Sequence, residues 1–168
     1  MTEIWDIVNE KGERLGVTWE RQNRDSIPEG AYHPCVEVWV KIDQRLLITQ
    51  RHPDKDEGLK YDVPGGAALA GEDILIGALR ELKEETGIAV SAGELKRLGS
   101  LLCGKAYAVS YLLELDYLPE IQLQPTEVVG YKLVTENELE GMQDDLTRGT
   151  FRRYLVYKDK IFNKKAER

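Results

Sequence analysis

The segment Asp73–Thr86 constrains the fold more than any other, because it has the pattern of a single helix with two different faces. Gly87 follows it as a residue that can end a helix. With about 100° of rotation per residue, three acidic side chains share one arc of about 100°. They are Glu81, Glu84 and Glu85. The neighbouring arc is an apolar stripe for the core, formed by Ile74, Leu75, Ala78, Leu79 and Leu82.

These three carboxylates need an explanation, since like charges on a helix repel one another by a few tenths of a kcal/mol per exposed pair. The C-terminal end of a helix also disfavours anions. A bound divalent cation would offset both effects, and Mg²⁺ prefers carboxylate oxygens and substrate phosphates as ligands. The alternative is a solvated acidic face on which Arg80 pairs with Glu84, four residues further on. The helix alone leaves both interpretations open.

A longer pattern surrounds the helix. From Gly66 to Ile88 the sequence reads G-x5-E-x7-R-E-U-x-E-E-x-G-U, in which U is a bulky aliphatic residue. This segment resembles the signature of the Nudix hydrolases at every specified position, which makes it far more specific than a single glycine motif. The positions that match by identity are Gly66, Glu72, Arg80, Glu81, Glu84, Glu85 and Gly87.

The resemblance implies both a fold and a chemistry. The fold class is α+β, a Nudix-type α/β/α sandwich with a mixed β-sheet, here with an N-terminal β-hairpin. Members of the family cleave a diphosphate linked to another group, typically in nucleotide derivatives, with Mg²⁺ or Mn²⁺. A diphosphate is anionic, so cations must mediate between it and the acids. We therefore expect hydrolysis of a small nucleoside-diphosphate-type substrate by metal-activated water.

The resemblance also assigns roles to the metal-binding residues. Glu84 and Glu85 match the main metal ligands of the family. Glu81 matches a position that is a ligand in some members and a candidate base in others. The carbonyl of Gly65 matches a frequent backbone ligand, and Glu72 matches an acid that binds metal or holds the loop.

Catalytic and substrate-binding candidates complete this set. Arg80 matches the arginine that orients the glutamates. Glu127 precedes a strand near the place where many members have a further catalytic glutamate, and the alternative is an exposed acid at a strand end. Arg51 and Lys60 flank the signature and are candidates for contacting phosphates, with ordinary surface charge as the alternative.

One domain is expected over residues 1–168, since a typical domain has about 100–200 residues. Residues 1–30 should form a hairpin and a loop, and residues 148–168 should contain the C-terminal helix. The segment Pro64-Gly65-Gly66 is predicted to interrupt regular structure and to let the backbone pass close to another group. Strands are predicted at Glu3–Val8, Leu15–Trp19, Cys35–Ile42, Leu46–Thr49, Tyr61–Val63, Lys96–Leu102, Ala106–Asp116 and Val128–Leu133. A short helix after Thr135 and a helix at Phe151–Phe162 complete the prediction.

The N-terminal region adds a second resemblance, to the isopentenyl-diphosphate-isomerase-like branch of the superfamily. It is carried by residues 3–16, by Gly30-Ala-Tyr-His33-Pro and by the strand that leads to Arg51. Isomerases of this kind use a cysteine, a glutamate and a histidine-rich metal site. Here the segment Tyr61–Ala68 has no cysteine, and the chain has only two histidines. Hydrolysis is therefore the first hypothesis, with an isomerase or a nucleotide-binding module without activity as alternatives.

The composition limits which classes of partner the chain is expected to bind. The net charge of −7 argues against nucleic acid as the main partner. Eight basic residues from Arg148 onward are interpreted as a solvated face. Cys35 and Cys103 are predicted to be buried thiols. No apolar run is long enough for a membrane span, and the acids of MTEIWDIVNE do not fit a signal peptide. These features predict a cytoplasmic protein with a small-molecule diphosphate substrate, and a homodimer stays open.

Overall fold

A seven-stranded mixed β-sheet forms the centre of the protein, in a computed structural model that describes residues 2–163. Its strands are β3 (His33–Ile42), β4 (Arg45–Arg51), β5 (Tyr61–Asp62), β6 (Gly65–Ala67), β7 (Lys96–Cys103), β8 (Ala106–Leu115) and β9 (Val128–Thr135). The order along the sheet is β5-β4-β3-β8-β7, with β6 paired to β3 and β9 paired to β4. The β3–β8 pair is parallel and the other pairs are antiparallel, which makes the sheet mixed as predicted.

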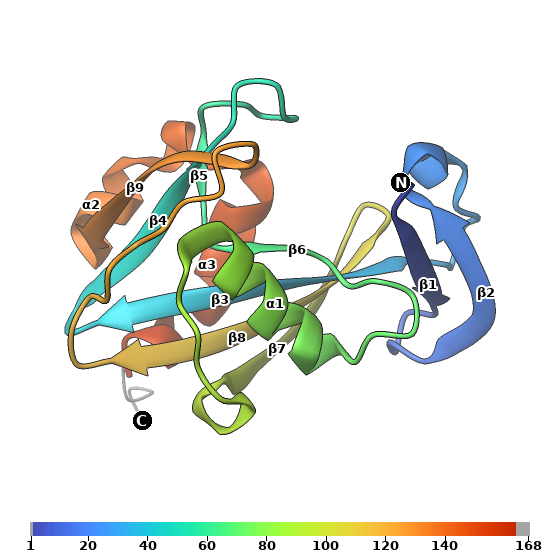
Figure 1. Cartoon of the computed structure of the whole chain (residues 1–168), viewed down its shortest axis with the longest axis horizontal. Helices are drawn as coiled ribbons and strands as arrows, with labels where there is room; N and C mark the ends of the chain where they lie inside the picture. The colour runs from blue at the N-terminus through green and yellow to red at the C-terminus, as the bar shows by residue number, and fades with distance from the viewer. Residues whose placement is uncertain (1, 164–168) are drawn as a thin grey trace.

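Helices cover both faces of this sheet (Figure 1). Helix α1 (Ile74–Thr86) lies on one face, and α2 (Glu136–Gly141) and α3 (Arg148–Ile161) lie on the other. The predicted α/β/α sandwich is thereby confirmed. None of the helices within residues 2–163 has the length and apolar character needed to cross a membrane.

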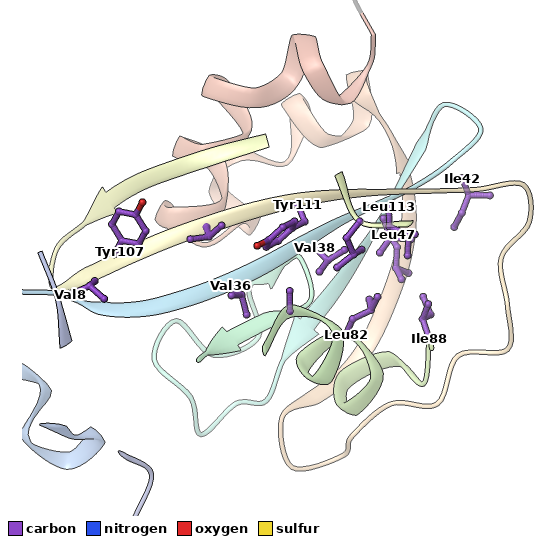
Figure 2. Close-up of a cluster of buried hydrophobic side chains, with 14 residues drawn as sticks. Val8, Val36, Val38, Ile42, Leu47, Leu82, Ile88, Tyr107, Tyr111 and Leu113 are labelled. Carbon is purple, nitrogen blue, oxygen red and sulfur yellow. The ribbon is translucent and has the colours of Figure 1, made fainter. Parts of the chain in front are cut away.

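Alternation along β3 directs its side chains into two separate cores. Val36, Val38 and Val40 pack in the same cluster as Leu82 of α1, as Figure 2 shows for the labelled members. Trp39 points to the opposite face and packs in the cluster that contains the buried tyrosines of α3. This period of two is the one that the valine pattern predicts. The strand thus fixes α1, and with it the acidic stripe, against the sheet.

Both ends of α1 are set by local chemistry. The Asp73 carboxylate accepts hydrogen bonds from the backbone N–H groups of Leu75 and Ile76. Gly87 adopts a left-handed conformation with φ of 76°, and its N–H donates to the Lys83 carbonyl. The helix predicted over residues 73–86 is confirmed, with Asp73 as its capping residue. These caps set where the helix begins and ends, and the packing of its apolar stripe against β3 sets the direction of its three glutamates.

The N-terminal hairpin lies at one end of the sheet (Figure 1). Strand β1 (Ile4–Val8) pairs with β2 (Arg14–Glu20), and Val8 forms a bridge to Tyr32 just before β3. The 3₁₀ helix η1 (Arg21–Ser26) follows β2, where the sequence predicts a loop. The polar run without apolar periodicity gave no signal for it, because a short 3₁₀ turn needs neither a stripe nor a cap.

Strand β6 is a second correction, since Pro64-Gly65-Gly66 is predicted to break regular structure. Gly65–Ala67 instead pairs antiparallel with β3. A Cβ atom on Gly65 would lie 2.2 Å from the carbonyl oxygen of Val36. The glycines therefore permit a closer approach of two backbones, which is a strand contact here and not an interruption.

The C-terminal helix and one of the thiols also differ from the predictions. Helix α3 begins at Arg148, three residues earlier than the predicted Phe151, with Thr147 as its capping residue. The part of the predicted C-terminal region at residues 164–168 lies outside the described residues. Cys35 and Cys103 are free cysteines, and both residues are intermediate in exposure, whereas the sequence predicts buried thiols. Burial nevertheless dominates the environment of the Cys35 thiol, so the prediction is wrong for Cys103 alone.

Candidate active site

A pocket of about 480 Å³ lies between the N-terminal hairpin, strand β6 and the acidic side of α1. Three glutamates of the signature line it, namely Glu81, Glu84 and Glu85, together with Gly65 and Arg80. The opposite walls come from the hairpin and from the loops after β4 and before β9. The fold therefore brings residues from both ends of the sequence to the signature helix.

The three glutamates differ strongly in exposure. Glu84 has a side chain that is 45% exposed, whereas that of Glu81 is only 14% exposed. Glu85 is buried, and its carboxylate accepts a hydrogen bond of 3.1 Å from the N–H of Gly65. Burial raises the pKa of Glu85 to about 8, and the charge of Asp62 adds to this rise. A simple solvated acidic face does not explain a carboxylate held in this environment.

Arg80 organises the carboxylates around it. Its guanidinium donates to Glu72 at 2.8 Å, to Glu81 at 2.7 Å and to Glu84 at 3.1 Å. It also donates to the carbonyl oxygen of Ala67. The pairing with Glu84 that the alternative interpretation predicts is present, but it belongs to this larger network. Burial raises the pKa of Glu81, and the hydrogen bond and charge of Arg80 oppose this rise.

A glycine makes room for this arrangement. A Cβ atom on Gly66 would lie 2.6 Å from the carboxyl carbon of Glu81, which is closer than real Cβ contacts allow. The absence of a side chain at Gly66 thus lets the Glu81 carboxylate lie against the backbone of β6. This geometry gives a physical reason for glycine at the first position of the signature.

Replacing Gly66 with alanine is expected to lower kcat by about 10- to 100-fold, because a displacement of about 1 Å can cost that much. The free energy of unfolding should change by less than about 1 kcal/mol, since the carboxylate end of Glu81 can move away. Steady-state kinetics and urea denaturation measure the two effects. Gly93→Ala is the matched control, because nothing lies within 4 Å of its Cβ position. Equal kinetics for the two variants would contradict the close contact with Glu81.

The chemistry of the donor set fits a hard divalent cation. Carboxylate oxygens from α1 and the backbone of Gly65 line one pocket, and Mg²⁺ takes such ligands together with waters and substrate phosphates. Within residues 2–163, no three His, Cys, Asp or Glu side chains are grouped closely enough to hold a metal ion by themselves. Glu72 does not line the pocket. It bonds Arg80 and accepts from the N–H of Leu69, so it holds the loop.

Of the remaining predicted residues, Glu127 and Arg51 line the pocket and Lys60 does not. Glu127 lines the pocket and forms an ion pair with Lys55, which also lines it. Arg51 lines the pocket and donates to Asp62 at 2.7 Å. Lys60 does not line it, so of the two predicted phosphate-binding residues only Arg51 is placed there.

Sequence reasoning missed part of this site. Asp62 does not line the pocket, but its side chain, which is 20% exposed, lies near Glu85. Burial raises the pKa of Asp62 although Arg51 opposes the rise. Trp5 of β1 and Arg21 and Arg24 of η1 line the pocket, and none of them was predicted to do so. No local signal marked these residues or Asp62, because only the packing of the chain brings them to α1.

His33 and Cys35 also reach the pocket, from the start of β3. His33 stacks on Trp5 with 4.2 Å between the ring centroids. Its buried Nδ1 has no hydrogen-bond partner among the described residues, and burial lowers the pKa of its imidazole to about 4. Burial raises the pKa of the Cys35 thiol to about 12, so this cysteine is not a thiolate at neutral pH.

The buried imidazole should make stability depend on pH. The unfolded chain binds a proton on His33 near pH 6.5, whereas the folded protein does so only near pH 4. The free energy of unfolding of the native protein should therefore fall by about 2–3 kcal/mol, relative to His33→Phe, as the pH drops from 6.5 to 4. Phenylalanine preserves the stacking on Trp5. Urea denaturation of both proteins at several pH values measures the difference, and parallel curves would show that the imidazole titrates normally.

Comparisons with known proteins show which family and fold this chain resembles. The family model described as NUDIX domain matches residues 31–157. An uncharacterized Nudix hydrolase of Listeria monocytogenes is 30% identical over 167 residues, which cover 97% of this chain and 95% of that protein.

Solved structures show the same fold. The crystal structure of DR0079 from Deinococcus radiodurans has a TM-score of 0.71 at 23% identity and covers 92% of this chain and 98% of that one. A bifunctional NMN adenylyltransferase/ADP ribose pyrophosphatase from Francisella tularensis, complexed with AMP and a Mn ion, has a TM-score of 0.66 at 19% identity. That match covers 77% of this chain and 42% of the other.

Proposed function

Because the chain belongs to the NUDIX family and is a pyrophosphatase-type hydrolase, we propose that it cleaves the diphosphate linkage of a small nucleoside-diphosphate derivative with Mg²⁺ or Mn²⁺. One observation carries the metal requirement. Glu81, Glu84 and Glu85 line one pocket, yet Glu85 is buried near Asp62 and forms no ion pair with a Lys or Arg of residues 2–163. A buried carboxylate near other acids is unfavourable unless positive charge compensates it. A divalent cation supplies that charge.

The described residues have separate tasks in this proposal. A divalent cation, when bound, would increase the acidity of a water molecule and offset charge on phosphate oxygens. Arg80 stabilises the carboxylate form of Glu81 and holds it at the pocket, where Glu81 can accept a proton from the attacking water. Glu127 is the alternative proton acceptor from the opposite wall. Arg51 and Lys55 face the same space and can contact phosphate oxygens.

A substrate screen tests this function. The protein is incubated with nucleoside diphosphates, nucleoside triphosphates, ADP-ribose and isopentenyl diphosphate, each with Mg²⁺, Mn²⁺ or EDTA, and products are identified by mass. We expect a metal-dependent monophosphate product from a nucleotide substrate. Dimethylallyl diphosphate from isopentenyl diphosphate would instead support the isomerase-like alternative. Tight binding of nucleotides without any product, with every metal, would support a binding module and overturn the proposal.

Two predictions from the sequence stay predictions. The cytoplasmic location and the homodimer rest on composition and on the resemblance. Size-exclusion chromatography with light scattering would measure the oligomeric state directly.

A further inference from the structure

One cation that lines the pocket, Arg24 of η1, differs from the others in the way it is paired. Four of the five cations that line the pocket each hold a carboxylate. These pairs are Arg21 with Glu3, Arg51 with Asp62, Lys55 with Glu127, and Arg80 with Glu72. Arg24 is the fifth, and its one ion pair among residues 2–163 joins it at 3.7 Å to Asp25, whose side chain is 97% exposed. Such a pair contributes little, so Arg24 is available to a ligand.

Arg21 lies on the same wall and faces the signature helix. Its guanidinium is 2.8 Å from Glu3, which also accepts a hydrogen bond from the indole of Trp5. The negative charges of Glu81 and Glu127 act on Arg21 as well. Arg21 and Arg24 are three residues apart in η1, which is kinked at Asn23 between them, and both residues line the pocket. The two arginines therefore reach the same pocket from one short segment of the chain.

The backbone that carries these arginines is held in place. The indole of Trp19 donates to the carbonyl oxygen of Asn23, and Lys105 donates to the carbonyl oxygen of Ile27. Ile27 is itself buried in the small core of the hairpin. Binding an anion at this wall would therefore order two side chains but no backbone, which lowers the entropic cost.

The hairpin is also tied to the loop of the signature. The N–H of Ala70 donates to the carbonyl oxygen of Ile4, and the N–H of Gly71 donates to the Asp6 carboxylate. Arg14 donates to the carbonyl oxygen of Glu72. These contacts fix the hairpin wall relative to the glutamates of α1, so the two ends of the pocket have a defined separation.

We propose that Arg24, with Arg21 beside it, forms a subsite for a further phosphate group of the substrate, in addition to the diphosphate that is cleaved. A phosphate fits better than a carboxylate, because its three free oxygens can contact two guanidinium groups at once. The substrate class is thus a diphosphate compound that carries one more phosphate, either at the end of the phosphate chain or as a monoester on a sugar. This inference rests on the proposed function of the same site.

Matched substrate pairs test the subsite. Coenzyme A with 3′-dephospho-coenzyme A and NADPH with NADH differ by a phosphate monoester, whereas ATP and ADP differ by a chain phosphate. We expect kcat/KM to be about tenfold higher for the phosphorylated member of one type of pair. Arg24→Ala should remove that advantage, and Arg24→Lys should retain part of it. The type of pair that responds identifies whether the phosphate is a monoester or a chain phosphate.

The control variant makes the same change in net charge at a position outside the pocket. Arg152 is exposed on α3 and does not line the pocket, so Arg152→Ala should keep the preference. Ratios near one in every pair, or an equal loss in both variants, would overturn the subsite.

Calorimetric titration separates this outcome from a failure of the proposed function. The affinities of both members of each pair are measured with Glu85→Gln and with Glu85→Gln/Arg24→Ala. If the protein hydrolyses none of the compounds, but binds one member of a pair about tenfold more tightly and loses this preference with Arg24→Ala, the hydrolysis is refuted and the subsite is retained. If the protein hydrolyses a compound but binds both members of every pair equally, the proposed function is retained and the subsite is refuted.

Discussion

Replacing Glu85 with glutamine is expected to lower kcat by about 100- to 1,000-fold, because it removes a charge that is aimed at the reacting groups. The metal-free variant should nevertheless be more stable than the native protein by about 1–2 kcal/mol. Glu85 is buried near Asp62 and Glu81, and an amide of the same shape avoids their repulsion. Its oxygen can still accept the hydrogen bond from Gly65. Kinetics with Mg²⁺ and thermal unfolding in EDTA measure the two effects.

The opposite signs of these effects make this prediction specific. A residue that is only structural would lose activity and stability together. Glu120→Gln is the control, since this exposed glutamate lies away from the pocket and should leave both quantities unchanged. Mg²⁺ should also raise the melting temperature of the native protein and have a smaller effect on Glu85→Gln. A variant with native kcat would exclude Glu85 from the metal site.

Replacing Arg80 with alanine is expected to lower the free energy of unfolding by about 2–4 kcal/mol, because it leaves enclosed carboxylates without a positive partner. The side chains of Glu72 and Glu81 are only 12% and 14% exposed. The kcat/KM value should also fall by about 10- to 100-fold, since Glu81 is no longer oriented. Chemical denaturation and steady-state kinetics provide the measurements.

Lys83→Ala is the matched control for Arg80. It removes one positive charge from the same helix, but Lys83 is exposed and does not line the pocket. Arg80→Lys should restore part of the stability but less of the activity, because one ammonium group cannot contact Glu72, Glu81 and Ala67 in the same geometry. Equal destabilisation by Lys83→Ala would show that general helix charge, and not the network, is responsible.

Much of the fold could be predicted from local patterns. The valines of β3, the capping residue Asp73 and the terminal Gly87 are each short-range signals, and the structure confirms the elements that they predict. Strand β6 and helix η1 were missed, because neither depends on a periodic apolar pattern. Strand β6 exists because glycine lets its backbone approach β3, which is a long-range contact.

The sequence by itself determined the family signature and the angular placement of Glu81, Glu84 and Glu85, because helix geometry relates residues three and four positions apart. Only the tertiary structure decided how deeply each carboxylate is buried, since burial depends on what packs against α1. It also placed Arg21 and Arg24 opposite the signature. About sixty residues separate them from α1 along the chain, a separation that local propensity cannot bridge.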